Sequence, residues 1–144
     1  MSALELRQAS SADVKHLFDL RNHPQVRKQS RNTDEIDFSE HKKWLKKVVL
    51  DESKRILIAE ENGIFVGMTR FELIDDAYLM SWAISPSFQG HGFGKEMIEM
   101  ALRIMEYDTI KAEIKKNNIA SIKIAEYIGM KLTKENEGTL FYLK

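Results

Sequence analysis

The feature that most constrains this chain is a run of three glycines at alternate positions, Gln89-Gly-His-Gly-Phe-Gly94, between a β-type segment and a helical one. Glycines let the backbone fold back, so that successive N–H groups point into one concavity. The following helix adds unpaired N–H groups and the positive end of its dipole. The run therefore predicts a pyrophosphate site, to which Lys95 on the first helical turn would add a charge.

Two other phosphate-binding motifs do not match this spacing. The P-loop needs Gly-Lys-Ser/Thr after a four-residue gap. The dinucleotide fingerprint has a different glycine spacing and usually follows the first strand of its unit. The remaining alternative is a glycine-rich connection without a ligand. The position of the run, between the turn at Ser85-Pro86 and a strong helical pattern, favours the phosphate site.

Hydrophobic periodicity predicts one mixed α/β (α+β) domain over residues 1–144, with the order β-α-α-β-β-β-α-β-α-β-β. Asn62-Gly63 is a strong hairpin signal between the second and third strands. Strands are expected over residues 3–9, 55–60, 64–73, 78–85, 109–114, 131–134 and 139–143.

Capping residues and helix breakers predict where the helices begin and end. The first helix is expected to follow Ser10 or Ser11 and to end at Asn22-His23-Pro24, because the residue before proline avoids the helical region. The other expected signals are Ser39 as cap of the second helix, Asn117 or Asn118 as cap of the last helix, and Gly129 at its end.

Composition excludes several classes of function. The chain has 22 Lys+Arg, 22 Asp+Glu and no cysteine. A net charge of zero gives no global field for nucleic acid or an anionic membrane. Disulfides, thiolate metal sites and acyl-cysteine intermediates are excluded. The four histidines have no metal-ligand spacing, so we expect no metal, and without a signal or membrane-spanning pattern we expect a cytoplasmic protein.

The glycine run resembles the coenzyme A motif of the GNAT superfamily of N-acetyltransferases, Arg/Gln-x-x-Gly-x-Gly/Ala. Ile84-Ser-Pro86 is similar to the Val-x-Pro of that family. Glu113-Ile-Lys-Lys-Asn-Asn118 and the stretch 121–130 resemble its second conserved block. The resemblance covers most of the chain. It implies a mixed, mostly antiparallel twisted sheet with helices on both faces, and transfer of acetyl from acetyl-CoA to an amine by direct attack.

The resemblance also implies which residues hold the coenzyme. In the family, the strand before the glycine loop separates from the next parallel strand, and the pantetheine arm lies in that gap. A backbone N–H at Trp82 or Ala83 would polarise the thioester carbonyl and hold the developing oxyanion. Asn118 and Ser121 match positions that contact the coenzyme arm, although Asn118 is also an ordinary helix cap. The residues implied as coenzyme-binding are Trp82, Ala83, Ile84, Gln89, Gly90, His91, Gly92, Phe93, Gly94, Lys95, Asn118 and Ser121.

An amine near neutral pH is mostly protonated, so a base should assist the reaction. Glu113 stands where several GNAT enzymes place that base, and Glu72 is a second candidate; either could instead be a solvent-facing strand carboxylate. The family's usual acid is a tyrosine four residues before a Gly-Phe pair, but that position here is Ala125, before Gly129-Met130. The other candidate acids are Tyr127, which lies on a different helix face, Tyr78, Tyr142 or a water. We expect His91 to contribute only backbone N–H groups.

The resemblance implies that the N-terminal helices and the loop between them select the acceptor. That region contains a local cationic stretch, which could bind an anionic acceptor such as the diphosphate of a nucleotide sugar and consists of Arg21, His23, Arg27, Lys28 and Arg31. Arg21, His23 and Arg27 are the residues expected to bind the acceptor. The alternative is a solvated loop balanced by Asp34, Glu35 and Asp37.

Arg-Asn-His-Pro at 21–24, followed by a Ser-Glu-His-x-x-Trp helix, resembles acetyltransferases of pseudaminic-acid-type sugar synthesis, which act on a UDP-linked amino sugar. The same layout occurs in ribosomal-protein N-terminal acetyltransferases. We expect a small-molecule amine acceptor, with a nucleotide-linked amino sugar as the first candidate, and a monomer or homodimer. The alternatives are a peptide N-terminal acetyltransferase and a non-catalytic acetyl-CoA-binding module.

Overall fold

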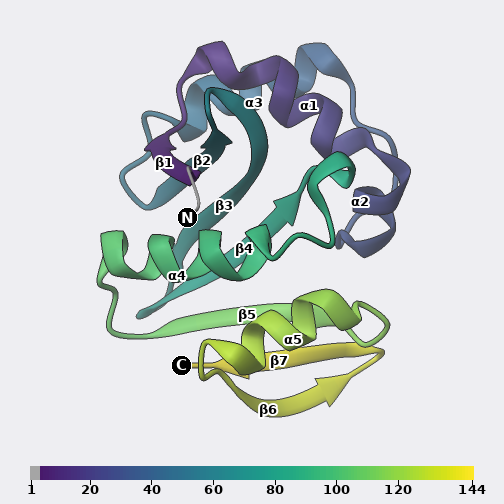
Figure 1. Cartoon of the computed structure of the whole chain (residues 1–144), viewed down its shortest axis with the longest axis vertical. Helices are drawn as coiled ribbons and strands as arrows, with labels where there is room; N and C mark the ends of the chain where they lie inside the picture. The colour runs from purple at the N-terminus through teal and green to yellow at the C-terminus, as the bar shows by residue number, and fades with distance from the viewer. Residues whose placement is uncertain (1–3) are drawn as a thin grey trace.

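The computed structural model describes residues 4–144 of the chain, so Ala3, the first residue of an expected strand, lies outside the described part. The described residues form seven strands and five α-helices, which Figure 1 labels. The strands are β1 (Leu4–Gln8), β2 (Lys54–Glu61), β3 (Ile64–Ile74), β4 (Ala77–Ile84), β5 (Ile110–Lys115), β6 (Lys131–Asn136) and β7 (Thr139–Leu143). The helices are α1 (Val14–Asn22), α2 (Pro24–Gln29), α3 (Phe38–Val48), α4 (Phe93–Met105) and α5 (Ile119–Tyr127).

The strands form one sheet in the order β1-β2-β3-β4-β5-β7-β6, and every neighbouring pair is antiparallel except β4–β5. A type I′-like turn joins β2 to β3, because Asn62 and Gly63 both have left-handed φ angles, 50° and 80°. The sheet and the expected mixed fold are confirmed. Figure 1 shows β4 and β5 close together where they begin and diverging along their lengths.

Helices cover both faces of the sheet. On one face, Met97, Ile98 and Ala101 of α4 pack with Ile124 and Ala125 of α5 in the larger core cluster. Figure 1 shows these two helices in front of the strands. On the other face, the smaller core cluster consists of residues from α1, α3 and β2, namely Leu17, Leu45, Val48, Ile56 and Ile58. Burying one such side chain stabilises the fold by about 1.5–3 kcal/mol.

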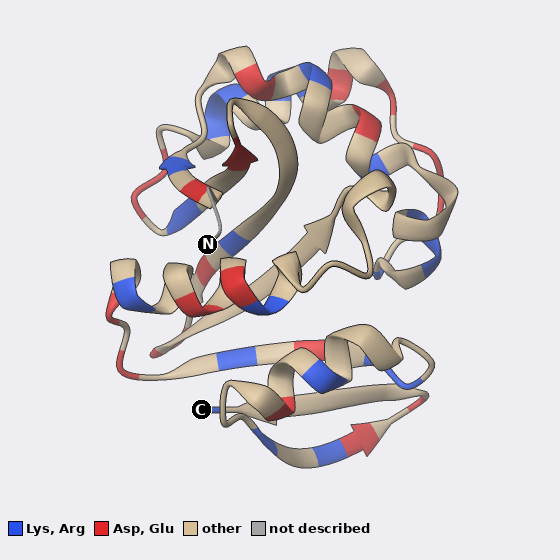
Figure 2. Cartoon of the chain, viewed as in Figure 1, with Lys and Arg blue, Asp and Glu red and all other residues tan. Residues whose placement is uncertain are grey.

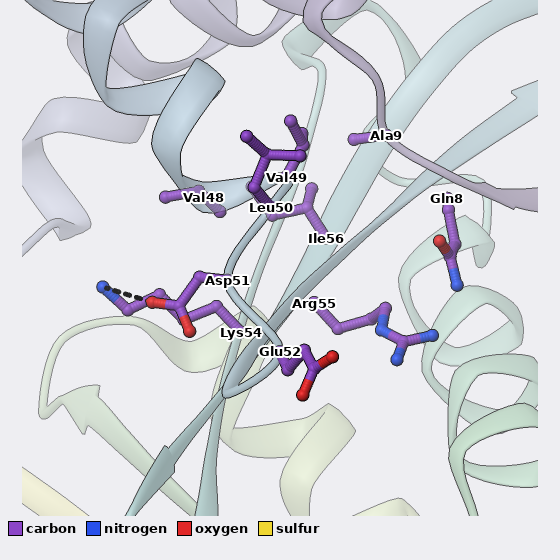
Figure 3. Close-up of a pocket in the computed structure, with 10 residues that line it drawn as sticks. All are labelled: Gln8, Ala9, Val48, Val49, Leu50, Asp51, Glu52, Lys54, Arg55 and Ile56. Carbon is purple, nitrogen blue, oxygen red and sulfur yellow. Dashed lines mark ion pairs between the residues drawn. The ribbon is translucent and has the colours of Figure 1, made fainter.

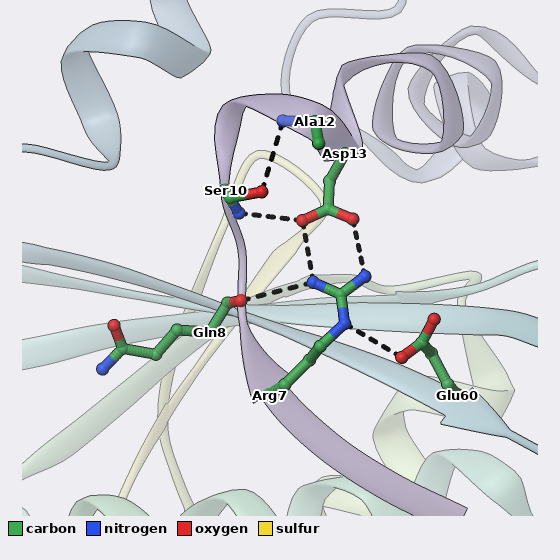
Figure 4. A network of polar contacts seen from close by, with 6 residues as sticks. All are labelled: Arg7, Gln8, Ser10, Ala12, Asp13 and Glu60. Carbon is green, nitrogen blue, oxygen red and sulfur yellow. Dashed lines mark hydrogen bonds and ion pairs between the residues drawn. The ribbon is translucent and has the colours of Figure 1, made fainter. Parts of the chain in front are cut away.

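A polar network fixes the start of α1 against the sheet (Figure 4). Arg7 donates to both carboxylate oxygens of Asp13, at 2.9 and 2.7 Å, and to Glu60 at 2.9 Å. Asp13 also accepts the N–H of Ser10, while the Ser10 hydroxyl accepts from Ala12, so Ser10 is the expected cap. It caps a short 3-10 turn, residues 11–13, that leads into α1. The hydrogen bonds from Arg7 lower the pKa of the buried Asp13 carboxyl.

The end of α1 before Pro24 is confirmed, whereas an additional helix and one helix cap differ from the predictions. Pro24 also begins this additional helix, α2, where it occupies a first-turn position that needs no N–H, with His23 as the cap. The cap of α3 is Asp37, whose carboxylate accepts the N–H of Glu40 at 3.1 Å. Ser39 lies inside the first turn of α3 instead, because Asp37 has the extended backbone that a capping residue needs.

Candidate functional site

The glycine run connects β4 to α4 and uses its three glycines in two different ways. Gly90 and Gly92 have φ angles of 82° and 80°, and an added Cβ would meet nothing within 4 Å. These two glycines allow the left-handed backbone conformation of the loop and leave the space beside it open. At Gly94 an added Cβ would lie 2.7 Å from Cδ1 of Ile124, so this glycine lets α4 pack closely against α5. Gly92 caps α4, whose first N–H groups lie beside the loop.

The parallel strands β4 and β5 separate soon after they begin. Within residues 4–144, they pair at Tyr78–Ile110 and Leu79–Lys111, and the register then ends although β4 continues to Ile84. The second half of β4 is therefore unpaired on the side of β5, as the resemblance implies. Backbone groups here have lost their strand partner and can bond an extended ligand in its place.

The direction of the backbone along β4 selects which amides face this gap. Tyr78 donates its N–H towards β5, to Thr109, at 3.0 Å, whereas Ser85 donates towards β3 at 2.8 Å. N–H direction alternates along a strand, so Trp82 shares the orientation of Tyr78, and Ala83 shares that of Ser85. Of the two amides expected at the thioester carbonyl, the geometry favours Trp82.

Side chains expected to contact the coenzyme already have partners within the chain. Trp82 donates its indole N–H to the hydroxyl of Ser121 at 3.1 Å. Asn118 caps α5 by accepting the N–H of Ser121 at 3.2 Å. Gln89 donates to the carbonyl of Ile84 at 3.1 Å and so ties the loop back to β4. The Ser121 hydroxyl and the Asn118 amide can still each donate a hydrogen bond.

The remaining residues of the loop point to solvent or to α5. His91 is exposed, with its ring 6.2 Å from that of Phe93. The ammonium of Lys95 lies 4.9 Å from the centre of the Tyr127 ring. A hydrogen bond with Glu99 raises the pKa of the Tyr127 phenol. Lys95 and Tyr127 thus form one exposed group at the start of α4.

Both candidate bases lie on the sheet face opposite α4 and α5, and both are ion-paired. Glu113 accepts from Arg31 at 2.6 Å and Glu72 accepts from Arg70 at 2.7 Å. The alternation of β5 puts Ala112 and Ile114 in the core with α4 and α5, and Glu113 on the other face. Arg70 also lies 5.4 Å from the Trp44 ring of α3, which places Glu72 on that face as well.

None of the tyrosines considered as acids joins these carboxylates. Tyr127 lies against α4, on the other side of the sheet. Tyr78 stacks on Tyr107 with 3.5 Å between the two ring centres, and Tyr142 is buried in the core. Ala125, which occupies the family's tyrosine position, is fully buried, so a larger side chain there would have to displace the core.

The cationic residues expected to bind the acceptor lie in the layer formed by α1, α2 and the following loop. Arg21 donates to the carbonyl of Asn32 at 2.7 Å, yet its Nη1 is buried and has no hydrogen-bond partner among the described residues. Nε of Arg27 is likewise buried without a partner in this part of the chain, while its Nη1 lies 3.7 Å from the carboxylate of exposed Glu35. His23 accepts the N–H of Gln25 as the cap of α2. Burial lowers the pKa of the Arg21 guanidinium, and the nearby positive charge of Arg27 lowers it further.

Sequence reasoning missed His41 as a member of this group. Its Nε2 is buried without a partner in the described chain, and burial together with the nearby Arg21 lowers its pKa. The ring of His41, on α3, also contacts the rings of Trp44 and Phe18. Acidic residues neutralise little of this charge, because Asp37 caps α3 and the pair of Arg27 with exposed Glu35 is loose, at 3.7 Å. In Figure 2, Lys/Arg and Asp/Glu are interspersed over the helices, strands and loops.

Two pockets open on the surface of the described chain. A pocket of about 130 Å³ lies between the end of α3 and the start of β2, and Asp51 and Lys54 pair across its edge at 3.9 Å (Figure 3). A second, of about 290 Å³, lies between α1 and the turn at Ser85-Pro86-Ser87. Among residues 4–144, no group of three or more His, Asp or Glu side chains could hold a metal ion. No helix in this part of the chain has the length and apolar character needed to cross a membrane.

A family model described as an acetyltransferase (GNAT) domain matches residues 3–131. The chain belongs to the GNAT acetyltransferase family. This confirms the resemblance found in the glycine run and the prediction of an acetyl-CoA-dependent N-acetyltransferase. The unpaired half of β4 and the open glycine loop are thus features of a GNAT domain in this chain.

Among sequence relatives, this GNAT chain is 28% identical to the acetyltransferase PseH of Campylobacter jejuni strain 81-176, over 81% of this chain and 76% of that protein. Among solved structures, YncA of Salmonella typhimurium with acetyl-CoA has a TM-score of 0.79 at 21% identity, over 99% and 93% of the two chains. RimL, a ribosomal L7/L12 α-N-protein acetyltransferase in complex with coenzyme A, has a TM-score of 0.81 at 17% identity, over 100% and 94%. At these identities the structural likenesses show a shared fold.

Proposed function

We propose that this chain transfers the acetyl group of acetyl-CoA to the amine of a nucleotide-linked amino sugar. The observation that carries the proposal is the pair of buried guanidinium nitrogens, on Arg21 and Arg27, that have no partner in the described chain. Buried donors without partners are costly, and a diphosphate would satisfy them with charge-assisted hydrogen bonds. Similarity to the PseH acetyltransferases and the resemblance of the segment 21–24 support the same acceptor.

The coenzyme site fits the residues that are present. Gly90 and Gly92 leave open space beside the loop, and the first N–H groups of α4 are available for two phosphates. Lys95 would add its charge at the same place. The outward N–H of Trp82 would hold the thioester carbonyl, in the unpaired half of β4. Bound acetyl-CoA supplies the activated acetyl group, and these residues orient it.

The acceptor amine would approach from the face that carries Glu113 and Glu72. A carboxylate there would accept the proton that the amine must lose, directly or through a water. Glu113 is the stronger candidate, because it lies on β5 at the edge of the gap, whereas Glu72 lies on β3. The acid that protonates the departing thiolate would be a water, because Tyr78 is stacked on Tyr107, Tyr142 is buried in the core and Tyr127 lies beside Lys95 at the phosphate end of the site.

The test is a screen of acetyl transfer to UDP-linked amino sugars, free amino sugars, polyamines and N-terminal peptides. We expect turnover of the UDP-linked class, and we expect Arg27→Gln to raise its KM about tenfold while the KM for acetyl-CoA stays unchanged. Arg103→Gln is the matched control, because Arg103 is exposed on α4 and meets only Glu99, at 4.0 Å.

Other outcomes would replace the proposal. Preference for peptides with no effect of Arg27→Gln would establish the peptide N-terminal alternative. Coenzyme binding without turnover of any amine would indicate a non-catalytic module. The cytoplasmic location and the choice between monomer and homodimer stay predictions, which fractionation and light scattering would check.

A further inference from the structure

Two contacts connect the end of α2 and the residues that follow it with β5, more than eighty residues away in the sequence. The guanidinium of Arg31 lies 2.6 Å from the carboxylate of Glu113. The ammonium of Lys115 donates to the backbone carbonyl of Lys28 at 2.9 Å. The segment 28–31 therefore rests on two neighbouring outward positions of one strand, Glu113 and Lys115.

This segment lies on the side of the sheet from which the acceptor would approach. Glu113 and Lys115 point away from α4 and α5, because Ala112 and Ile114 point towards them. The contact between Trp82 and Ser121 joins β4 to α5 on the opposite face. The segment 28–31 is thus the part of the chain that contacts the candidate base from the acceptor side.

Arg31 is also next to the cationic residues proposed to bind the acceptor. Arg21 donates at 2.7 Å to the carbonyl of Asn32, the residue that follows Arg31. Arg27 lies in the last turn of α2, four residues before Arg31 in the sequence, and pairs with Glu35 across the loop that follows. An anion bound by Arg21 and Arg27 would therefore attract the guanidinium of Arg31 as well.

The ion pair of Arg31 is one that an anion can displace. The Arg31 side chain is 78% exposed, and solvent screens an exposed pair so that it contributes little to stability. A guanidinium binds a phosphate through two parallel, charge-assisted hydrogen bonds, which are stronger. Exchange of the Glu113 carboxylate for a diphosphate is therefore favourable for Arg31.

We propose that Arg31 is a specificity-determining residue that couples acceptor recognition to the candidate base. Before the acceptor binds, the Arg31 guanidinium is paired with the Glu113 carboxylate. A diphosphate-linked acceptor draws the guanidinium away, and the freed carboxylate then accepts a hydrogen bond from the acceptor amine. An amine without an anionic group leaves the pair closed and is acetylated slowly. This inference rests on the proposed function, because it requires an anionic acceptor and Glu113 as the base.

The first experiment measures binding of uridine diphosphate by calorimetry, which does not depend on turnover. Glu113→Gln removes the competitor for Arg31, so we expect affinity to rise about two- to fivefold. Arg31→Gln removes one contact, so we expect affinity to fall about tenfold. Arg103→Gln, which changes an exposed arginine on α4, should leave the affinity unchanged. Equal affinity in the wild type, Glu113→Gln and Arg31→Gln would overturn the inference.

The second experiment compares kcat/KM for a UDP-linked amino sugar with that for the same sugar without the nucleotide. In Arg31→Gln we expect kcat/KM for the UDP-linked sugar to fall about tenfold and kcat/KM for the free sugar to rise, so that the preference for the anionic acceptor is lost. Arg31→Lys should restore part of it. A purely structural role would lower both values together, and that result contradicts the inference. If the wild-type protein neither binds uridine diphosphate nor uses the UDP-linked sugar, the proposed acceptor itself is wrong.

Discussion

The indole N–H of Trp82 donates to the hydroxyl of Ser121 at 3.1 Å and so connects β4 to α5 where the two parallel strands have already separated. The same Ser121 donates its backbone N–H to Asn118, the cap of α5. The side chain of Trp82 thus contacts the start of α5, while the backbone amide of the same residue remains directed into the gap. This contact bridges β4 and α5 where no ladder hydrogen bonds join the second half of β4 to β5 in the described chain.

Trp82→Phe keeps an aromatic side chain but removes the donor to Ser121. We expect it to lower the free energy of unfolding by about 1 kcal/mol, as expected for one neutral hydrogen bond, and Ser121→Ala to do the same. Since both changes remove a single interaction, the double variant should cost less than the sum of the two, as urea titrations would measure. Strict additivity would show that the bond does not hold α5 to β4.

Gly92→Ala should impair coenzyme binding, and Gly63→Ala is its matched control. Both glycines have a φ of 80° with open space around them, so either alanine should lower the free energy of unfolding by about 1–2 kcal/mol through backbone strain. Gly63 belongs to the β2–β3 turn, whereas Gly92 begins α4 beside the phosphate site. Calorimetry should show that Gly92→Ala alone weakens coenzyme A binding; equal affinity in both variants would contradict the assignment of the loop.

Gly94→Ala should act through packing of α4 on α5. The added Cβ would lie 2.7 Å from Cδ1 of Ile124, and such crowding typically costs 1–3 kcal/mol, or about 2 kcal/mol here. Ile124→Val removes that terminal carbon, so the double variant should recover most of the loss even though Ile124→Val alone costs about 1 kcal/mol. Thermal unfolding of the wild type, the two single variants and the double variant measures this recovery. If Ile124→Val does not rescue Gly94→Ala, the glycine is required for the backbone conformation at position 94 and not for packing.

Asp13→Asn should remove a pH-dependent part of the stability. Because hydrogen bonds from Arg7 lower the pKa of Asp13 in the folded chain, its contribution is present above the unfolded pKa and disappears as pH falls through the folded value. At pH 7 we expect the variant to lose about 1–3 kcal/mol, and the difference from wild type should shrink in acid.

Urea titrations between neutral and acidic pH would follow this difference. Asp19→Asn is the control, because the pair of Asp19 with Lys15 is exposed and should contribute almost nothing. A difference between Asp13→Asn and wild type that does not change with pH would show that the carboxylate charge is not what stabilises the start of α1.

Local signals in the sequence predicted the parts of the fold that depend on neighbouring residues. Asn62-Gly63 fixes a hairpin because its backbone angles are set within the turn, and Gly129 ends α5 with a left-handed φ for the same reason. The cap of α3 was missed because Asp37 and Ser39 are both suitable side chains, and only the direction of the incoming loop selects Asp37. Helix α2 was missed because Pro24 signals an end and a beginning with the same residue.

By itself, the sequence determined the order of the strands and of all helices except α2, the hairpin, the glycine loop and, through its motifs, the acetyltransferase family, because each depends on residues close together in the chain. Only the tertiary structure decided that Arg31 pairs with Glu113, that His41 joins Arg21 and Arg27, and that Trp82 rather than Ala83 faces the gap. The physical reason is that strand register and the packing of α1–α3 on the sheet bring distant residues together, and no local spacing in the sequence encodes those contacts.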